Sequence, residues 1–421
     1  MGVKDIKYYI GRKTAEKGWT DAFKQAIADM EKEGGGTLYV PSGIYETCSI
    51  CLKDNMRLEL DAGAVLKFLD NRELYEVIET EYEGIKKKMY MPLIYARQAQ
   101  NVSVTGTGVI DGQGMRWWKE KDTLPCARPY LICFEECQSV SVEGVTLKNS
   151  PAWTIHPIYC DNVKIHGVTI HNPADSPNTD GIDPDCSSNV RISDCIIDVG
   201  DDCIAIKAGT EETKNKRPCE NITVTNCNMI HGHGGVVIGS EMSGTVRNVT
   251  VTNCVFQDTD RGIRLKTKRR RGGAMERLTF QNIVMDRVIS PITFNMYYYC
   301  GEKGKEKYVW DKAPYPVDET TPVIRDISIS NLIVNDASAC AGFFYGLPEQ
   351  PIENVTISNA FIRLKPEGPA GNPAMMGNIE PMRAAGFFMR NVKGVVLNQV
   401  KLMGNITPDA DCDETADFIW K

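Results

Sequence analysis

The sequence predicts an all-β fold: a single-stranded right-handed parallel β-helix, a solenoid of about ten coils, with an N-terminal helical cap. Two observations predict the coils. A nine-residue phrase, roughly Asn-Val-x-Ile-x-Asn-Cys-x-Ile, recurs along the 421 residues, and its apolar and polar places alternate as in a strand. No long helical pattern separates the copies. The clear copies begin at Asn162, Asn189, Asn221, Asn248, Arg277, Asp326 and Asn354.

The first element expected is an amphipathic helix over residues 20–33, which would cover the open edge of the first coil. Phe23, Ile27 and Met30 fall on one face of this helix, and Thr20 is its expected N-cap. We expect one domain over residues 1–421. Its parts would be a cap region at 1–36, coils at 37–405 and a C-terminal tail at 406–421.

A second phrase follows in each coil and is expected to form a second strand, with its third and fifth places pointing inward. Ile204 with Ile206 and Val236 with Ile238 are examples. Because stacked strands lie about 4.8 Å apart, residues of one column become neighbours in space. Residues 302–321 interrupt the repeat and should form an excursion loop. The five Asn-x-Ser/Thr sequences mostly open the repeat phrase, where Asn suits a turn.

Composition limits the function classes. A net charge of −7 argues against nucleic acid as the main partner, and no apolar run of about 20 residues is present to span a membrane. Residues 1–12 carry no apolar signal core, so the expected location is the cytoplasm. Cys195, Cys227 and Cys254 share an inward column with valines, which predicts core packing rather than disulfides or metal ligation.

The outward columns gather carboxylates. Asp180 and Asp202 occupy the same place in successive coils, and Asp201 shares the preceding place with His233. One such residue alone is more often part of a turn, but several in register repel one another and raise the pKa of at least one. Paired carboxylates without an evident nucleophile or metal cluster predict general acid/base cleavage of a glycosidic bond, with no metal or other cofactor.

Two cations follow in the next columns of the same face. Arg264 follows Asp183 in its column, after Ala205 and Val237, and Lys266 shares a column with Lys207 and Asp185. Because Arg binds carboxylates with two parallel hydrogen bonds and Lys binds them as a point charge, the expected substrate is acidic.

Four motifs, in this order, give the sequence a resemblance to a known family: Asn178-Thr-Asp180, Gly200-Asp-Asp202, Gly232-His-Gly234 and Arg264-Leu-Lys266. The chain resembles the polygalacturonases, the pectin-hydrolysing glycoside hydrolases of family 28. The likeness runs from Gly34-Gly-Gly-Thr-Leu-Tyr-Val-Pro to about Tyr299 and departs at residues 8–19, where the family has a Gly-rich opening.

The resemblance implies inverting hydrolysis of α-1,4-galacturonosidic bonds in pectin-derived galacturonate chains. Asp201 would be the general acid, Asp180 and Asp202 would activate water, and His233 would set the protonation of the acid. Asn178 would orient Asp180 or a sugar hydroxyl.

The resemblance also assigns the cations and an aromatic residue. Arg264 and Lys266 would hold a galacturonate carboxylate. Of the three tyrosines at 297–299, Tyr298 is favoured to stack at the site.

Exo action is the expected mode, because the sequence from Lys266 to Gly273 resembles that of exo-acting bacterial members. This basic run is expected to be a solvated loop or to bind further carboxylates. Residues 82–88 are expected to form a loop that closes the cleft, and a cytoplasmic enzyme would meet imported oligomers. The alternatives are an endo-polygalacturonase, a rhamnogalacturonan or xylogalacturonan hydrolase, a β-helical pectate lyase, and a glycan-binding β-helix without activity.

Overall fold

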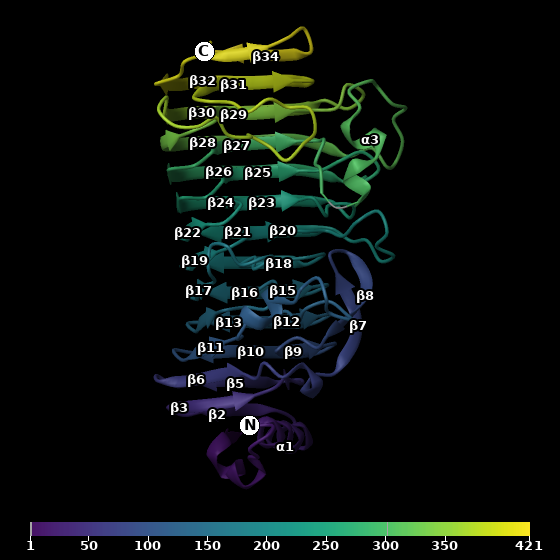
Figure 1. The fold of residues 1–421 in the computed structure, drawn as a ribbon, viewed down its shortest axis with the longest axis vertical. Helices are drawn as coiled ribbons and strands as arrows, with labels where there is room; N and C mark the ends of the chain where they lie inside the picture. The colour runs from purple at the N-terminus through teal and green to yellow at the C-terminus, as the bar shows by residue number, and fades with distance from the viewer. Residues whose placement is uncertain (1, 301) are drawn as a thin grey trace. The chain divides into compact units, whose positions relative to one another are not determined.

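The computed structural model describes residues 2–300 and 302–421, which form two compact units that meet in the sequence between Asp201 and Asp202. We call them unit 1 and unit 2 and describe each by itself. Each unit consists of coils of a right-handed parallel β-helix, so the predicted fold class is confirmed (Figure 1). No helix among the described residues is long and apolar enough to cross a membrane.

The described residues of unit 1, from Gly2 onward, form two parallel sheets, one hairpin and four short helices. The first sheet contains β1 (Gly2–Asp5), β2 (Gly36–Val40), β3 (Gly43–Thr47), β5 (Met56–Leu60), β6 (Ala64–Phe68), β10 (Gln100–Gly106), β11 (Val109–Asp111), β13 (Gln138–Glu143), β14 (Thr146–Lys148), β16 (Asp161–His166), β17 (Thr169–His171), β18 (Ser188–Ser193) and β19 (Ile196–Val199). The second contains β4 (Ile50–Cys51), β9 (Ile94–Arg97), β12 (Ile132–Glu135) and β15 (Ile155–Ile158). The hairpin is β7 (Val77–Tyr82) with β8 (Ile85–Tyr90), and the helices are η1 (Ile6–Arg12), α1 (Thr20–Lys32), η2 (Arg72–Leu74) and α2 (Met115–Lys119).

Unit 2 repeats the same layout with longer strands. One sheet contains β21 (Cys219–Thr225), β22 (Asn228–His231), β24 (Val246–Gln257), β26 (Ala274–Asp286), β28 (Val323–Ala337), β30 (Ile352–Leu364), β32 (Val392–Met403) and β34 (Ala416–Trp420). The other contains β20 (Asp202–Ile206), β23 (Gly234–Gly239), β25 (Arg261–Lys266), β27 (Ser290–Asn295), β29 (Cys340–Tyr345), β31 (Ala385–Arg390) and β33 (Ala410–Cys412). The helices η3 (Glu302–Lys305) and α3 (Lys307–Trp310) lie between β27 and β28.

The corners of the coils explain the repeat phrase. Its first residue adopts a left-handed backbone in every clear copy, with φ of 58° at Asn221 and 57° at Asn248. Asn tolerates this conformation better than most residues, which is why it opens the phrase so often. A second corner of unit 2 forms an amide ladder, in which Asn282 donates to Asn253 (3.0 Å) and Asn331 donates to Asn282 (2.9 Å).

The inward columns are as predicted. Ile204 pairs with Val236 and then Ile263, and Ile206 pairs with Ile238 in the same sheet; all are buried. Cys195 in unit 1 and Cys227 and Cys254 in unit 2 are also buried, and Cys254 is in register with Ile283. Their column is part of the core, because a thiol there packs like a small apolar side chain.

The N-terminal cap differs from the prediction by one residue. Helix α1 buries Phe23, Ile27 and Met30 as expected, but the N-cap is Trp19 and Thr20 lies in the first turn. The Thr20 hydroxyl instead donates to the Lys17 carbonyl (2.5 Å) and accepts from the Cys48 amide (2.9 Å). Thr20 therefore joins the helix to the first coil.

The sequence predicted an excursion at residues 302–321 and a C-terminal tail at residues 406–421. The expected excursion at 302–321 leaves the coils between β27 and β28. The expected tail at 406–421 is wrong, because β33 and β34 pair in parallel with β31 and β32 and complete another coil. A further excursion, residues 365–384, covers the outer face of unit 2, where Pro373 O accepts from Arg261 Nε (3.3 Å).

Residues 82–88, expected as a loop, span the turn of the β7–β8 hairpin. Glu83 and Gly84 both have positive φ, 53° and 70°, as a two-residue hairpin turn requires. The ring of Tyr82 stacks on Tyr130 and Trp153, with centroids 5.5 and 5.9 Å away. The hairpin is thereby fixed to the second sheet of unit 1.

Candidate active site

The two carboxylates of unit 1 come from neighbouring connections. Asp180 lies in the loop after β17, where its carbonyl accepts from the Thr154 amide (2.8 Å), and its side chain is buried. Asp201 directly follows the turn after β19 and is half-buried. Oxygens of the two carboxylates lie within 4.8 Å of each other. The structure therefore brings these two predicted site residues together.

Thr179 and Gly200 hold these two connections together. Thr179 Oγ1 accepts from the Gly200 amide (3.3 Å) and bonds to Ser176 Oγ (2.6 Å). A Cβ on Gly200 would lie 2.3 Å from Ser176 O, so only glycine allows this approach. Asn172 Nδ2 also donates to Thr154 Oγ1 (3.0 Å) beneath the loop.

In unit 2, Asp202 contacts both predicted cations. Arg264 Nη1 lies 3.2 Å from Asp202 Oδ1, and Lys266 Nζ lies 2.7 Å from Oδ2; all three side chains are buried. Arg264 follows Val237 in its column and Lys266 follows Gly239, so both long side chains reach back across β23. A side chain at Gly234 would crowd this approach, since its Cβ would lie 3.3 Å from Asp202 Oδ1.

These charges keep Asp202 ionised. Burial alone would raise its pKa, but Lys266, Arg264 and Lys207 outweigh burial and hold the pKa of Asp202 well below its usual range. A carboxylate in this state accepts hydrogen bonds but has no proton to give. The environment of Asp202 is therefore unsuited to a general acid.

His233 and Tyr298 flank this ion group in unit 2. His233 is exposed, and its carbonyl accepts from Arg264 Nη1 (3.4 Å). The Tyr298 ring faces both cations, 5.8 Å from Arg264 Cζ and 5.2 Å from Lys266 Nζ. Burial raises the pKa of the Tyr298 hydroxyl, so it stays protonated. Of the tyrosines at 297–299, Tyr298 is the one in contact with these cations, whereas Tyr297 is fully buried elsewhere.

The basic run after Lys266 is not the solvated loop that the sequence suggested. Lys268, Arg269 and Arg271 are buried. Lys268 and Arg271 both pair with Glu211, and Arg269 pairs with Glu349. These side chains hold the unit 2 loops in place, and only Arg270 is exposed.

Sequence reasoning missed Arg128. It is buried in unit 1, and its Nη2 donates to Asn178 Oδ1 at 2.6 Å. Asn178 itself has a left-handed backbone with φ of 55°. Arg128 lies 50 residues from Asn178 in the chain and outside the repeat phrase, so no local pattern points to it.

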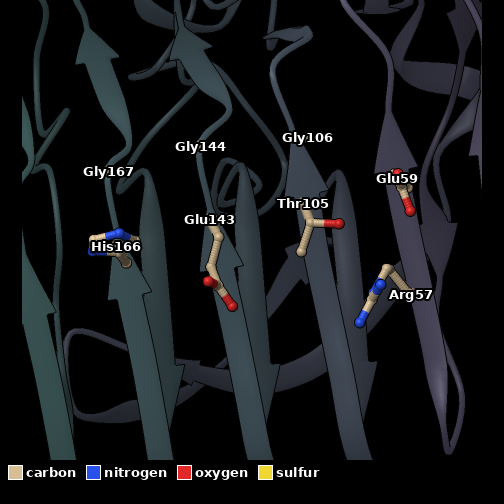
Figure 2. Close-up of a pocket in the computed structure, with 8 residues that line it drawn as sticks. All are labelled: Arg57, Glu59, Thr105, Gly106, Glu143, Gly144, His166 and Gly167. Atoms are coloured by element: carbon tan, nitrogen blue, oxygen red, sulfur yellow. The ribbon is translucent and has the colours of Figure 1, made fainter.

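A shallow hollow of about 470 Å³ on the first sheet of unit 1 is a different feature (Figure 2). Gly106, Gly144 and Gly167 line it. Of its charged side chains, Glu143 pairs with Lys164 (2.7 Å). It contains none of the predicted site residues.

A β-helix that carries paired carboxylates and an ionised carboxylate beside two cations defines a class: a glycoside hydrolase suited to acidic glycans. The model of the family described as "Glycosyl hydrolases family 28" matches residues 66–313. The chain therefore belongs to the glycosyl hydrolases of family 28, and its relatives there are polygalacturonases.

A probable polygalacturonase from Vitis vinifera is 33% identical over 359 residues, which cover 82% of this chain and 71% of that protein. The crystal structure of a hyperthermoactive exopolygalacturonase from Thermotoga maritima is 31% identical, with a TM-score of 0.75, and the match covers 94% of this chain and 92% of that one. A family 28 exopolygalacturonase from Yersinia enterocolitica, 20% identical with a TM-score of 0.78 over 99% of this chain and 76% of that one, shares the fold.

The expected cytoplasmic location is wrong. The relatives that overturn it are plant polygalacturonases, and galacturonan, the polymer in their name, belongs to the plant cell wall outside the cytoplasm. The argument that exo action suits imported oligomers falls with it.

Proposed function

We propose that the chain hydrolyses α-1,4 bonds of galacturonan and removes galacturonate from a chain end. The observation that carries the exo mode is the β7–β8 hairpin, which covers the second sheet of unit 1 through Tyr82, Tyr130 and Trp153. A polymer that ran on across that sheet would need the space that the hairpin fills. The 31% identity to an exopolygalacturonase over 94% of this chain supports the same mode.

We further propose a role for each predicted catalytic residue. Asp201, the half-buried carboxyl, gives a proton to the leaving oxygen, while ionised Asp202 and Asp180 activate water with inversion at the sugar. His233 assists the protonation of Asp201, and Asn178 orients Asp180.

Arg264 and Lys266 are proposed to bind the carboxylate of a galacturonate, with the Tyr298 ring against the sugar. What supports this assignment is the group that these three side chains already form beside Asp202. An acidic sugar would meet two buried cations there, and it would do so next to the proposed base.

Product analysis on trigalacturonate and on polygalacturonan tests the exo mode. We expect monogalacturonate from the first turnover on and a slow fall of polymer viscosity. Random mid-chain products with rapid viscosity loss would show endo action, and an ultraviolet-absorbing unsaturated product would show a lyase.

The acid assignment is tested by Asp201→Asn, with Asp198→Asn as the matched control. Asp198 is three residues earlier and pairs with His171 at 3.1 Å. We expect Asp201→Asn to lose hydrolysis by about a thousandfold or more and the control to keep it. Retained hydrolysis in Asp201→Asn would refute the assignment.

A further inference from the structure

Arg128 contacts the loop that carries Asn178 and Asp180 and, in the preceding coil, Pro151. Its Nη1 donates to the carbonyls of Pro151 and Pro177, both at 2.8 Å. Its Nη2 donates to Asn178 Oδ1 at 2.6 Å, and the side chain is only 5% exposed. One planar guanidinium thus fixes both the position of the loop and the amide of Asn178.

The hairpin lies against Tyr130, two residues after Arg128 in the chain. Tyr82, the last residue of β7, stacks almost parallel on Tyr130 (4° between ring planes) and on Trp153 (10°). Burial raises the pKa of the Tyr82 hydroxyl, and the nearby charge of Arg128 offsets part of that rise. Arg128 thus bonds to the Asn178 loop, and the hairpin stacks on Tyr130 in the same segment of the chain.

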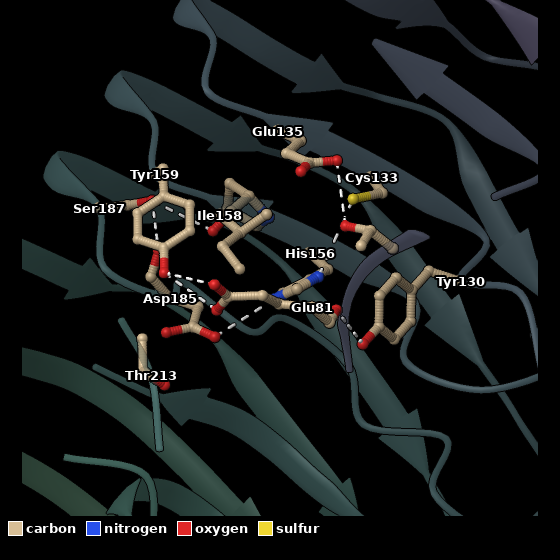
Figure 3. A network of polar contacts seen from close by, with 12 residues as sticks. Glu81, Tyr130, Cys133, Glu135, His156, Ile158, Tyr159, Asp185, Ser187 and Thr213 are labelled. Atoms are coloured by element: carbon tan, nitrogen blue, oxygen red, sulfur yellow. Dashed lines mark hydrogen bonds and ion pairs between the residues drawn. The ribbon is translucent and has the colours of Figure 1, made fainter. Parts of the chain in front are cut away.

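More contacts fix the same hairpin strand. Tyr159 donates to both oxygens of Glu81 (2.9 Å each), and Tyr130 donates to the Glu81 carbonyl (3.3 Å) (Figure 3). Thr80 Oγ1 donates to Glu135 (3.0 Å). Residues 80–82 are thus anchored to the sheet at every position, so Tyr82 presents one fixed surface to Arg128.

We propose that Arg128 is a positioning residue of the active site, and that it holds Asn178 and Asp180 in reacting geometry only while the hairpin is docked through Tyr82. This rests on the proposed function. A carboxylate displaced by about 1 Å costs roughly a hundredfold in rate. Hairpin docking therefore sets the rate as well as the stability of unit 1.

Three variants of the full chain test this on trigalacturonate. Arg128→Lys keeps the charge but not the planar fork, and Tyr82→Phe keeps the stacked ring but not the hydroxyl. Arg72→Met is the control, because Arg72 also lies over an aromatic ring, that of Trp117 at 5.6 Å, and pairs with Glu120.

We expect kcat to fall at least about tenfold in Arg128→Lys and a few-fold in Tyr82→Phe, with KM within about threefold of wild type and the pH–rate profile shifted. Arg72→Met should lower the melting temperature and leave kcat unchanged. Equal, small effects on kcat in all three variants would overturn the proposal and leave Arg128 a structural residue.

A second measurement does not depend on catalysis. Trypsin cuts after lysine, and the exposed Lys86, Lys87 and Lys88 lie in β8. We expect faster cleavage there in Arg128→Lys than in Arg72→Met. Unchanged cleavage would overturn the coupling between Arg128 and the hairpin, even if the proposed substrate proved wrong. Failure of the wild type on all oligogalacturonates would instead refute the proposed function.

Discussion

Adding one methyl group at Gly200 should separate the two carboxylates of unit 1. In Gly200→Ala the new Cβ would lie 2.3 Å from Ser176 O, 2.7 Å from Pro173 O and 2.8 Å from Ser176 Oγ. Contacts below 3.0 Å do not persist, so the Asp180 loop must move by roughly 0.7 Å away from Asp201. We expect a loss of about 1 to 3 kcal/mol in the free energy of unfolding and a fall in kcat of about ten- to a hundredfold.

The assay combines urea unfolding with initial rates of reducing-end release from trigalacturonate. Gly11→Ala is the control, because a Cβ at Gly11 meets nothing within 4 Å. The control should match wild type in both measurements. If Gly200→Ala lost stability but kept full kcat, the close approach of the two loops would not position the carboxylates, and the reasoning would be refuted.

Three further predictions concern Asp202, Glu81 and the anomer that is released. Asp202→Asn leaves the buried charges of Arg264 and Lys266 without their partner and should lower the free energy of unfolding by about 3 to 5 kcal/mol; a loss below about 1 kcal/mol in urea would contradict the ion group. Burial raises the pKa of Glu81, so the folded wild type loses stability as pH rises from 4.5 through that raised pKa. Glu81→Gln should therefore have the same melting temperature as the wild type at pH 4 and a higher one at pH 7. A melting temperature below that of the wild type at pH 7 would contradict this prediction. Hydrolysis should release the β-anomer of galacturonate first by NMR. This test can go against the proposed inversion, because oxygens of Asp180 and Asp201 lie within 4.8 Å, whereas the carboxyl groups of inverting pairs usually stand about 6.5 to 9.5 Å apart. Release of the α-anomer first would show retention.

The coils could be predicted because their physics is local. Alternation fixes which side chains point inward, and a left-handed corner residue fixes where each strand ends, as at Asn221 and Asn248. The grouping of Asp202 with Arg264 and Lys266 followed from counting columns, because parallel register converts sequence spacing into contact.

The remainder depends on contacts between distant segments. Arg128 reaches Asn178 across 50 residues, and the hairpin is held by ring stacking that no alternation reveals. The run at Lys268 to Arg271 looked like a solvated surface, but long aliphatic stems can be buried once carboxylates such as Glu211 pair with their charged ends. These contacts join residues that are distant in the sequence, so they could not be predicted from local patterns.

The amide ladder of unit 2 has a consequence for how the chain folds. Asn226, Asn253, Asn282, Asn331 and Asn359 each bond to the next through their side chains, from 2.8 to 3.4 Å. A strand that paired one residue out of step would turn its apolar side chains to water, and it would also break the ladder at that rung. The ladder therefore adds to the free-energy difference between correct and shifted register at each coil of unit 2.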